Sequence, residues 1–107
     1  MTEPDPLHLE AATTALVVID LQKGIVGRPC EPHATADVVG NAARLANAMR
    51  ERGGFVVLVT VSFGPDRRDA LHPMSDDPGW GSTPLPADWA EIVSEMGPRP
   101  GDHLVTK

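Results

Sequence analysis

An apolar run that ends abruptly in a carboxylate is the sequence feature that most constrains this fold. Residues 15–19 read Ala-Leu-Val-Val-Ile, and Asp20, Leu21 and Gln22 follow directly. An apolar run without alternation is typical of a strand covered on both faces, as in the parallel sheet of an α/β domain. Ligands of such sheets bind beyond the carboxyl ends of the strands. Asp20 is therefore the first candidate for chemistry.

A helix and a second strand are predicted to follow. Residues 36–52 repeat apolar side chains at helical spacing, with Thr35 as the expected cap and Gly53 as the expected stop signal. Residues 55–61 form another continuous apolar run. A right-handed crossover makes two such strands parallel. Residues 24–32, which contain two glycines and two prolines, are expected to be a loop.

The second half of the chain is predicted to hold a long loop, a short helix and a third strand. Residues 62–86 are rich in Pro, Gly, Asp and Ser. Loops longer than about 12–15 residues are uncommon in compact domains unless they are functional or mobile, so we expect this one at the active-site end of the sheet. Residues 87–96 carry apolar side chains on one helical stripe, and residues 103–107 read as a strand.

The predicted sheet is small, with three strands. Open sheets usually have about four to six strands, so residues 14–107 are expected to be the amino-terminal part of a single larger α/β domain. Residues 1–13, which Pro4 and Pro6 interrupt, are expected to form an N-terminal arm.

Composition narrows the class of partner and the location. Fifteen acidic residues against nine Lys and Arg give a formal net charge of -6, which disfavours nucleic acid and anionic membranes as partners. No apolar stretch approaches the roughly 20 residues of a membrane span. The amino terminus lacks the basic and apolar regions of a signal peptide, so a cytoplasmic location is predicted. The single cysteine, Cys30, excludes an intrachain disulfide.

Two charged side chains close apolar strands at one predicted edge of the sheet. Lys107 ends the third strand as Asp20 ends the first, and parallel strands would bring both to the same crevice. An Asp and a Lys brought close hold each other ionised, which suits a carboxylate used as a base and an ammonium that steadies negative charge. Gln22 would place an amide beside the acid. The structural alternatives are that Asp20 caps its loop and that Lys107 is simply solvated.

Other reactive side chains and cofactor motifs carry weaker signals. Cys30 lies in a loop and not at a helix N-terminus, where a thiolate would be stabilised, so a packing or loop role is expected. The four histidines show no close ligand spacing, and Asp69 with His72 is a weak metal signal. No glycine fingerprint follows the first strand, which argues against a nucleotide cofactor.

The long loop carries three further side chains of interest. Arg67 and Arg68 could bind an anionic substrate, but adjacent arginines in a polar loop are expected to be solvated. Trp80 could be a lid aromatic over a pocket or a local packing anchor.

The arrangement resembles the isochorismatase-like hydrolase superfamily. Residues 14–22 match that family's first strand, which ends in an apolar, Asp, apolar, Gln pattern, and residues 104–107 resemble the later strand that supplies the family's lysine. The resemblance implies a Rossmann-like, mostly parallel six-stranded sheet with helices on both faces, of which this chain would hold an incomplete three-strand portion. It also implies a small-molecule substrate, no cofactor and a homo-oligomer.

The resemblance also implies catalytic roles. In the cysteine hydrolase branch an Asp, a Lys and a Cys form a triad, so Asp20 would take the thiol proton and Lys107 would stabilise developing charge during attack on an amide-like carbonyl. Gln22 would contact the substrate. The family's cysteine belongs to the N-terminus of a later helix, and Cys30 does not align with it. The activity would then need residues beyond Lys107.

Alternatives to this triad stay open. In true isochorismatases the nucleophile position lacks cysteine, and the acid donates a proton to a vinyl ether. A non-catalytic family member is also compatible with the sequence. A receiver-like signalling domain shares a strand-end Asp and Lys, but Glu10 lies upstream of the strand and not at the magnesium position. Residues 62–66 do not reproduce the metal motif of the nicotinamidase branch, so no metal is expected.

Overall fold

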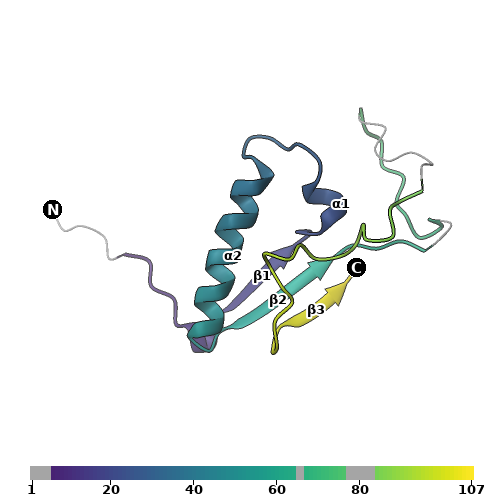
Figure 1. Ribbon diagram of the computed structural model, residues 1–107. Helices are drawn as coiled ribbons and strands as arrows, with labels where there is room; N and C mark the ends of the chain where they lie inside the picture. The colour runs from purple at the N-terminus through teal and green to yellow at the C-terminus, as the bar shows by residue number, and fades with distance from the viewer. Residues whose placement is uncertain (1–5, 65–66, 77–83) are drawn as a thin grey trace.

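A three-stranded parallel sheet with one long helix against it forms the framework of the protein (Figure 1). The computed structural model describes residues 6–64, 67–76 and 84–107. The elements in chain order are the 3-10 turn η1 (Ala11–Thr13), β1 (Ala15–Ile19), the short helix α1 (Lys23–Val26), α2 (Thr35–Glu51), β2 (Phe55–Thr60) and β3 (His103–Thr106). The predicted α/β class and the three predicted strands are confirmed.

The central strand of the sheet is β2, which pairs in parallel with β1 on one side and with β3 on the other. Leu58 lies opposite Val18 in the first pair and opposite Leu104 in the second. Because all three strands run the same way, their carboxyl ends lie at one edge of the sheet, toward the right in Figure 1. Residues that follow β1 and β3 are therefore separated by the width of one strand.

One face of the sheet is covered by α2 and by the segment that precedes β3. The buried apolar cluster comprises Val18, Val39, Ala46, Val56, Leu58, Val93 and Met96. Side chains that alternate with these along the strands point the other way, and Val17, Ile19 and Phe55 are 51%, 55% and 49% exposed. The unbroken apolar run predicted a strand covered on both faces. In the described part of the chain, the sheet is covered on one face.

The predicted helix over residues 36–52 is confirmed within one residue at each end, as α2. The expected Thr35 cap is wrong, because Ala34 is the N-cap residue and no side chain there bonds to the helix end. Gly53 ends the helix as expected. Its φ of 75° lies in the left-handed region that favours glycine, and its N–H donates to the Arg50 carbonyl at 3.3 Å.

The predicted helix over residues 87–96 is wrong. This segment forms turns and one isolated antiparallel bridge between Ile92 and Gln22. Two of its carbonyl groups bond to the chain that follows β1, because the Lys23 N–H donates to the Glu91 carbonyl at 2.8 Å and the Gly24 N–H to the Trp89 carbonyl at 2.9 Å. The apolar side chains whose spacing predicted the helix are buried nonetheless, and these are Trp89, Val93 and Met96. Their apolar spacing reflects core packing and not helix periodicity.

The two predicted loops differ in outcome. The first contains α1, a helix of four residues that the two glycines and two prolines of residues 24–32 did not indicate. The described parts of residues 62–86 contain neither helix nor strand, as expected. Trp80 lies outside the described residues.

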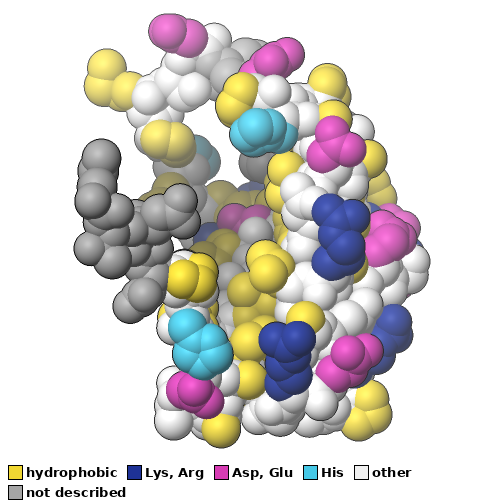
Figure 2. Space-filling view, turned by 90° about the vertical axis from the view of Figure 1, so that its left-hand side faces the viewer, with side chains coloured by type: hydrophobic (Ala, Val, Ile, Leu, Met, Phe, Trp, Pro, Cys, Tyr) yellow, Lys and Arg dark blue, Asp and Glu magenta, His cyan; other side chains and the backbone are white. Residues whose placement is uncertain are grey.

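Charged side chains of both signs are interspersed on the face shown in Figure 2, with hydrophobic side chains around a hollow between them. Such mixing of signs is typical of an exposed surface and differs from a concentrated basic patch. Among the described residues, no helix has the length and apolar character needed to cross a membrane.

Candidate active site

Asp20 and Lys107 meet at the carboxyl edge of the sheet. Asp20 follows β1, Lys107 follows β3, and the Lys107 Nζ donates to the Asp20 Oδ2 at 3.2 Å across the end of β2. The two side chains are 32% and 51% exposed, respectively. The structure thus brings together the two charged residues that strand-end positions predicted, in a place that a small molecule can reach.

The two oxygens of the Asp20 carboxylate have different surroundings. While Oδ2 binds Lys107, Oδ1 is buried and has no hydrogen-bond partner among the described residues. The Asp20 backbone is fixed by a bond from its N–H to the Val59 carbonyl at 2.9 Å, and its φ is 66°. Few non-glycine residues adopt this conformation, but aspartate is among those that tolerate it. A buried hydrogen-bond acceptor without a partner lowers the stability of the folded state, and a catalytic role is one explanation for such a group in a native structure.

Gln22 is fully buried and bonds to backbone on two sides. Its Oε1 accepts the Val61 N–H at 2.8 Å, and its Nε2 donates to the Val61 carbonyl at 2.9 Å and to the Trp89 carbonyl at 3.3 Å. The amide therefore reproduces the pair of bonds that a neighbouring strand would make. In this structure the Gln22 side chain ties the end of β1 to the end of β2 and does not lie open in the crevice.

The segment that follows Gln22 is held against residues 88–91. Lys23 Nζ lies 3.0 Å from Glu91 Oε1 and 3.8 Å from Asp88 Oδ2. The hydrogen bond to Glu91, followed by the charge of Glu91, raises the pKa of Lys23. Close packing accompanies this pair, because a Cβ at Gly24 would collide with the indole ring of Trp89. These contacts make the turn after β1 a fixed support for Asp20.

A cleft of about 290 Å³ opens beside Asp20. Its walls come from the ends of β1 and α1, the start of α2 and the loop that joins the helices; they are mostly apolar, with Cys30, Glu31 and His33 supplied by the loop. Ligand pockets commonly measure about 300–1,000 Å³. The cleft is therefore at the lower end of the usual size range, with Asp20 in its wall.

The remaining candidates engage other groups. Both carboxylate oxygens of Asp69 accept the Gly64 N–H, at 3.0 and 3.1 Å, and so close their own loop. The Arg67 N–H donates to the Gly64 carbonyl at 2.9 Å in the same turn. Cys30 is exposed, with its Sγ 3.5 Å from the Arg28 carbonyl. Within residues 6–64, 67–76 and 84–107, no three His, Cys, Asp or Glu side chains are grouped to hold a metal ion.

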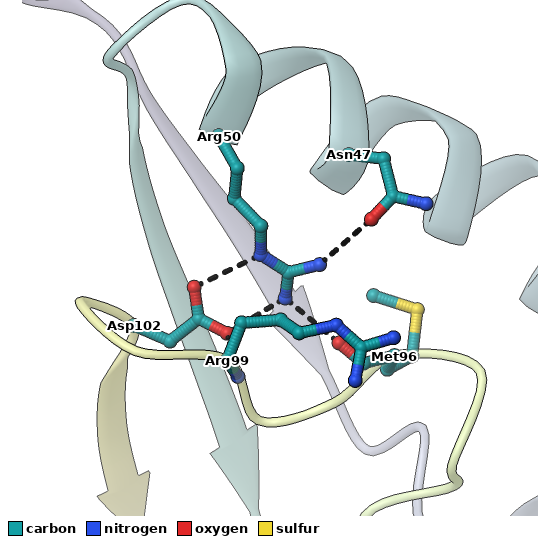
Figure 3. A network of polar contacts seen from close by, with 5 residues as sticks. All are labelled: Asn47, Arg50, Met96, Arg99 and Asp102. Atoms are coloured by element: carbon teal, nitrogen blue, oxygen red, sulfur yellow. Dashed lines mark hydrogen bonds and ion pairs between the residues drawn. The ribbon is translucent and has the colours of Figure 1, made fainter.

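A second aspartate–cation pair lies at the opposite end of β3 (Figure 3). Arg50 donates through Nε and Nη2 to the two carboxylate oxygens of Asp102, at 3.0 and 2.6 Å. Burial raises the pKa of Asp102, but the bonds from Arg50 and the Arg99 N–H, with the two arginine charges, lower it below its usual range overall. Sequence patterns did not identify this pair. The available signals were an acid directly before the third strand and an arginine near the end of the predicted helix, 52 residues apart in the sequence.

Comparison with known proteins places this geometry in a family. The family model for the isochorismatase domain matches residues 14–107. The chain belongs to the isochorismatase family. The family resemblance stated from the sequence is thereby confirmed, as is the α/β fold class.

Several isochorismatase-family relatives match nearly all of the chain. An uncharacterized family protein of Bacillus subtilis, YwoC, is 47% identical over 102 residues, which cover 94% of this chain and 51% of the relative. The ureidoacrylate amidohydrolase RutB of Stutzerimonas stutzeri is 30% identical over 127 residues, covering 97% and 51%. A solved family structure from Burkholderia thailandensis has a TM-score of 0.76 at 40% identity, covering 92% and 51%. The chain thus spans about half the length of the curated relatives it matches.

Proposed function

We propose that this chain supplies the aspartate and lysine of a hydrolase site that cleaves an amide-like C–N bond in a small molecule. The observation that carries the proposal is the 3.2 Å contact between Lys107 Nζ and Asp20 Oδ2 at the carboxyl edge of the sheet. Family membership supports it, as does similarity to a relative named as an amidohydrolase. The cleft beside Asp20 offers room for a compact substrate.

In the proposed reaction Asp20 is the general base. Its Oδ1, which has no partner in the described part of the chain, accepts the proton of a cysteine thiol. The thiolate attacks the carbonyl carbon, and the C–N bond then breaks as the amine leaves with the proton that Asp20 had taken. Water hydrolyses the resulting thioester with Asp20 again as base. Lys107 donates a hydrogen bond to Asp20 and, in this proposal, lies close to the negative charge that develops on the substrate.

The proposed nucleophilic cysteine lies outside residues 1–107. The family resemblance assigns it to the N-terminus of a later helix, where a thiolate is stabilised. Cys30 is instead exposed on the loop between α1 and α2, although it lines the same cleft as Asp20. Cys30 is therefore a wall residue in this proposal, and its replacement is a control for the choice of nucleophile.

We further propose that Gln22 positions Asp20, in place of the substrate contact expected from the sequence. All of the described hydrogen bonds of its side chain go to the backbone of Val61 and Trp89. A rigid turn on both sides of Asp20 holds the carboxylate where a bound substrate meets it, and such support of a reactive group strongly affects rate.

The test is replacement of Asp20 in the complete encoded protein, with ammonia release measured over a panel of small amides and N-carbamoyl compounds. Asp20→Asn keeps the size of the side chain but removes the base, so kcat is expected to fall by about 10²–10⁴-fold. Asp88→Asn is the matched control, because it changes a partly exposed acid that lies 3.8 Å from Lys23. Circular dichroism establishes that each variant is folded.

Three results would overturn the proposal. Turnover retained in Asp20→Asn would exclude Asp20 as the base. Loss of turnover in Cys30→Ala, with the fold intact, would make Cys30 the nucleophile and exclude a thiol supplied from elsewhere. If turnover requires Asp20 but is unchanged after alkylation of the protein's cysteine thiols, the nucleophile is not a thiol and the proposed amide mechanism is wrong.

A further inference from the structure

The strand that carries Lys107 is held by few contacts. β3 has four residues, all exposed, and among the described residues it pairs only with β2. At its carboxyl end the Lys107 N–H donates to the Thr60 carbonyl at 2.9 Å, and the Ser62 N–H donates to the Lys107 carbonyl at 3.1 Å. A strand this short with one described partner has little of its own to define its register.

The amino end of β3 is anchored far more firmly, by the pair in Figure 3. The Asp102 side chain is 2% exposed and the Arg50 side chain 16%. Asp102 Oδ2 also accepts the Arg99 N–H at 2.8 Å, so both carboxylate oxygens are bonded and the turn before β3 is closed. A bidentate bond between arginine and carboxylate fixes orientation as well as distance.

A single guanidinium therefore joins three segments. Arg50 belongs to the last turn of α2, whose Ala46 is fully buried against the sheet. Its Nη2 donates to the carbonyl of Met96, which is itself fully buried, at 2.7 Å, in addition to its bond to Asp102. The hydrogen bonds of Arg50 thus attach the start of β3 to the same core against which β1 and β2 pack.

The position of this anchor decides where Lys107 lies. Because strand side chains alternate, a slip of one residue in β3 would turn Lys107 to the opposite face and move it by about 3.3 Å along the sheet. Either change removes the contact of 3.2 Å with Asp20. We propose that Arg50 and Asp102 are positioning residues, whose ion pair fixes the register of β3 and thereby holds Lys107 against Asp20. The importance of that contact for catalysis rests on the proposed function, whereas the positional claim does not.

The experiment measures the chemical accessibility of Lys107 directly. Lys23 and Lys107 are the two lysines of this chain, and Lys23 has its own partners at 3.0 and 3.8 Å, so it serves as an internal reference. The complete encoded protein is treated briefly with an amine-acylating reagent, and the ratio of label at Lys107 to label at Lys23 is read by peptide mass spectrometry. Release of a partly exposed ion pair should raise this ratio by about two- to fivefold in Asp102→Asn and in Arg50→Lys.

Two reference variants define the outcomes. Asp20→Asn removes the partner of Lys107 and should give the same rise, while Asn47→Ala removes a bond of 3.1 Å to the same guanidinium without touching the link to β3 and should give none. An unchanged ratio in folded Asp102→Asn and Arg50→Lys would overturn the proposal. So would equal rises at both lysines, which indicate general loosening. Circular dichroism establishes folding, and the milder Arg50→Lys keeps the test available if Asp102→Asn does not fold.

Activity separates this proposal from the proposed function. With a substrate in hand, Asp102→Asn should lower kcat by about threefold or more with KM nearly unchanged, because the pair acts through Lys107 and not on substrate binding. A raised label ratio in Asp102→Asn and Arg50→Lys, together with full activity in Asp20→Asn, would support the positioning role and reject the catalytic one. An unchanged ratio in those two variants, together with an inactive Asp20→Asn, would reject the positioning role and support the catalytic one.

Discussion

The two ends of β3 each carry an aspartate paired with a cation, and the two pairs are built in opposite ways. At the amino end the Asp102 side chain is 2% exposed, and both of its oxygens accept hydrogen bonds from two nitrogens of Arg50. At the carboxyl end Asp20 is 32% exposed, a single bond joins it to Lys107, and its second oxygen has no partner in the described structure.

This difference separates a carboxylate with both oxygens bonded from one with a free acceptor. A carboxylate whose two oxygens both accept hydrogen bonds stabilises the fold, and because those bonds and the arginine charges lower its pKa it accepts a proton less readily. A carboxylate with one oxygen bonded and the other buried without a described partner keeps acceptor capacity, at some cost in stability. One aspartate–cation pair thus fixes the turn before β3, while the other leaves the acceptor oxygen that the proposed reaction requires.

We call Arg50 and Asp102 the closed pair, because both carboxylate oxygens are bonded, and Lys107 and Asp20 the open pair, because one oxygen has no described partner. The largest expected effect comes from breaking the closed pair. Arg50→Ala leaves the buried Asp102 carboxylate and the Met96 carbonyl without their partner, and should lower the free energy of unfolding by about 3–5 kcal/mol. Lys107→Ala breaks the half-exposed pair and should lower it by less than about 1 kcal/mol. Urea denaturation followed by circular dichroism measures both. Equal losses in the two variants would remove the distinction between the pairs.

The next effect concerns the backbone beneath the open pair. Gln22→Leu keeps the volume of the side chain but leaves the Val61 N–H and the Val61 and Trp89 carbonyls without their amide partner. The expected loss is about 2–3 kcal/mol of unfolding free energy, again from urea denaturation. A loss below about 0.5 kcal/mol, which is usual for surface substitutions, would show that the turn carrying Asp20 does not depend on this amide.

A smaller effect is the pH dependence of the closed pair. Because its partners lower the pKa of Asp102 in the folded protein, its stabilising contribution is complete above the unfolded pKa of about 3.9 and is lost as pH falls through the lower folded pKa. Unfolding free energy should therefore decline below about pH 4, and less so in Asp102→Asn. Thermal unfolding at pH 2–6 measures the slope. Parallel curves for the two proteins would contradict the assignment of this dependence to Asp102.

The smallest effect is expected at the open pair itself. Asp20→Asn removes the negative charge of a carboxylate whose buried oxygen has no described partner, and asparagine also tolerates the φ of 66° at this position. We expect unfolding free energy to rise by about 0.5 kcal/mol, as is common when a strained functional group is neutralised. Differential scanning calorimetry resolves such a shift. A loss of more than 1 kcal/mol would place Asp20 with Asp102 as a structural residue.

Local patterns predicted the framework of the fold well. The apolar runs of β1 and β2 and the helical spacing of α2 each lie within one continuous segment, so their signals needed no knowledge of the tertiary structure. The segment 87–96 shows where this fails. Its apolar residues had helical spacing, but the chain after β1 offered partners to its carbonyl groups, as in the bond from Lys23 to Glu91, and the segment adopted turns.

The site was predictable only in part, for a related reason. Asp20 and Lys107 follow strands, and parallel topology alone brings strand ends to one edge. Gln22 is different, since its partner Val61 is 39 residues away along the chain, and no local pattern tells a crevice amide from a buried one. Arg50 and Asp102, separated by 52 residues, give no joint signal in a single sequence for the same reason.

The central place of β2 has a consequence for how such proteins diversify. Because β1 and β3 are both registered on β2, the separation of Asp20 and Lys107 does not depend on the length of the connection over residues 61–102. Each doubling of a loop's length costs only about 0.6 kcal/mol in closure entropy. The match to RutB extends over 127 residues against the 107 of this chain, so insertions are tolerated within the aligned region. The connection between β2 and β3 can therefore lengthen while Asp20 and Lys107 stay side by side at one edge of the sheet.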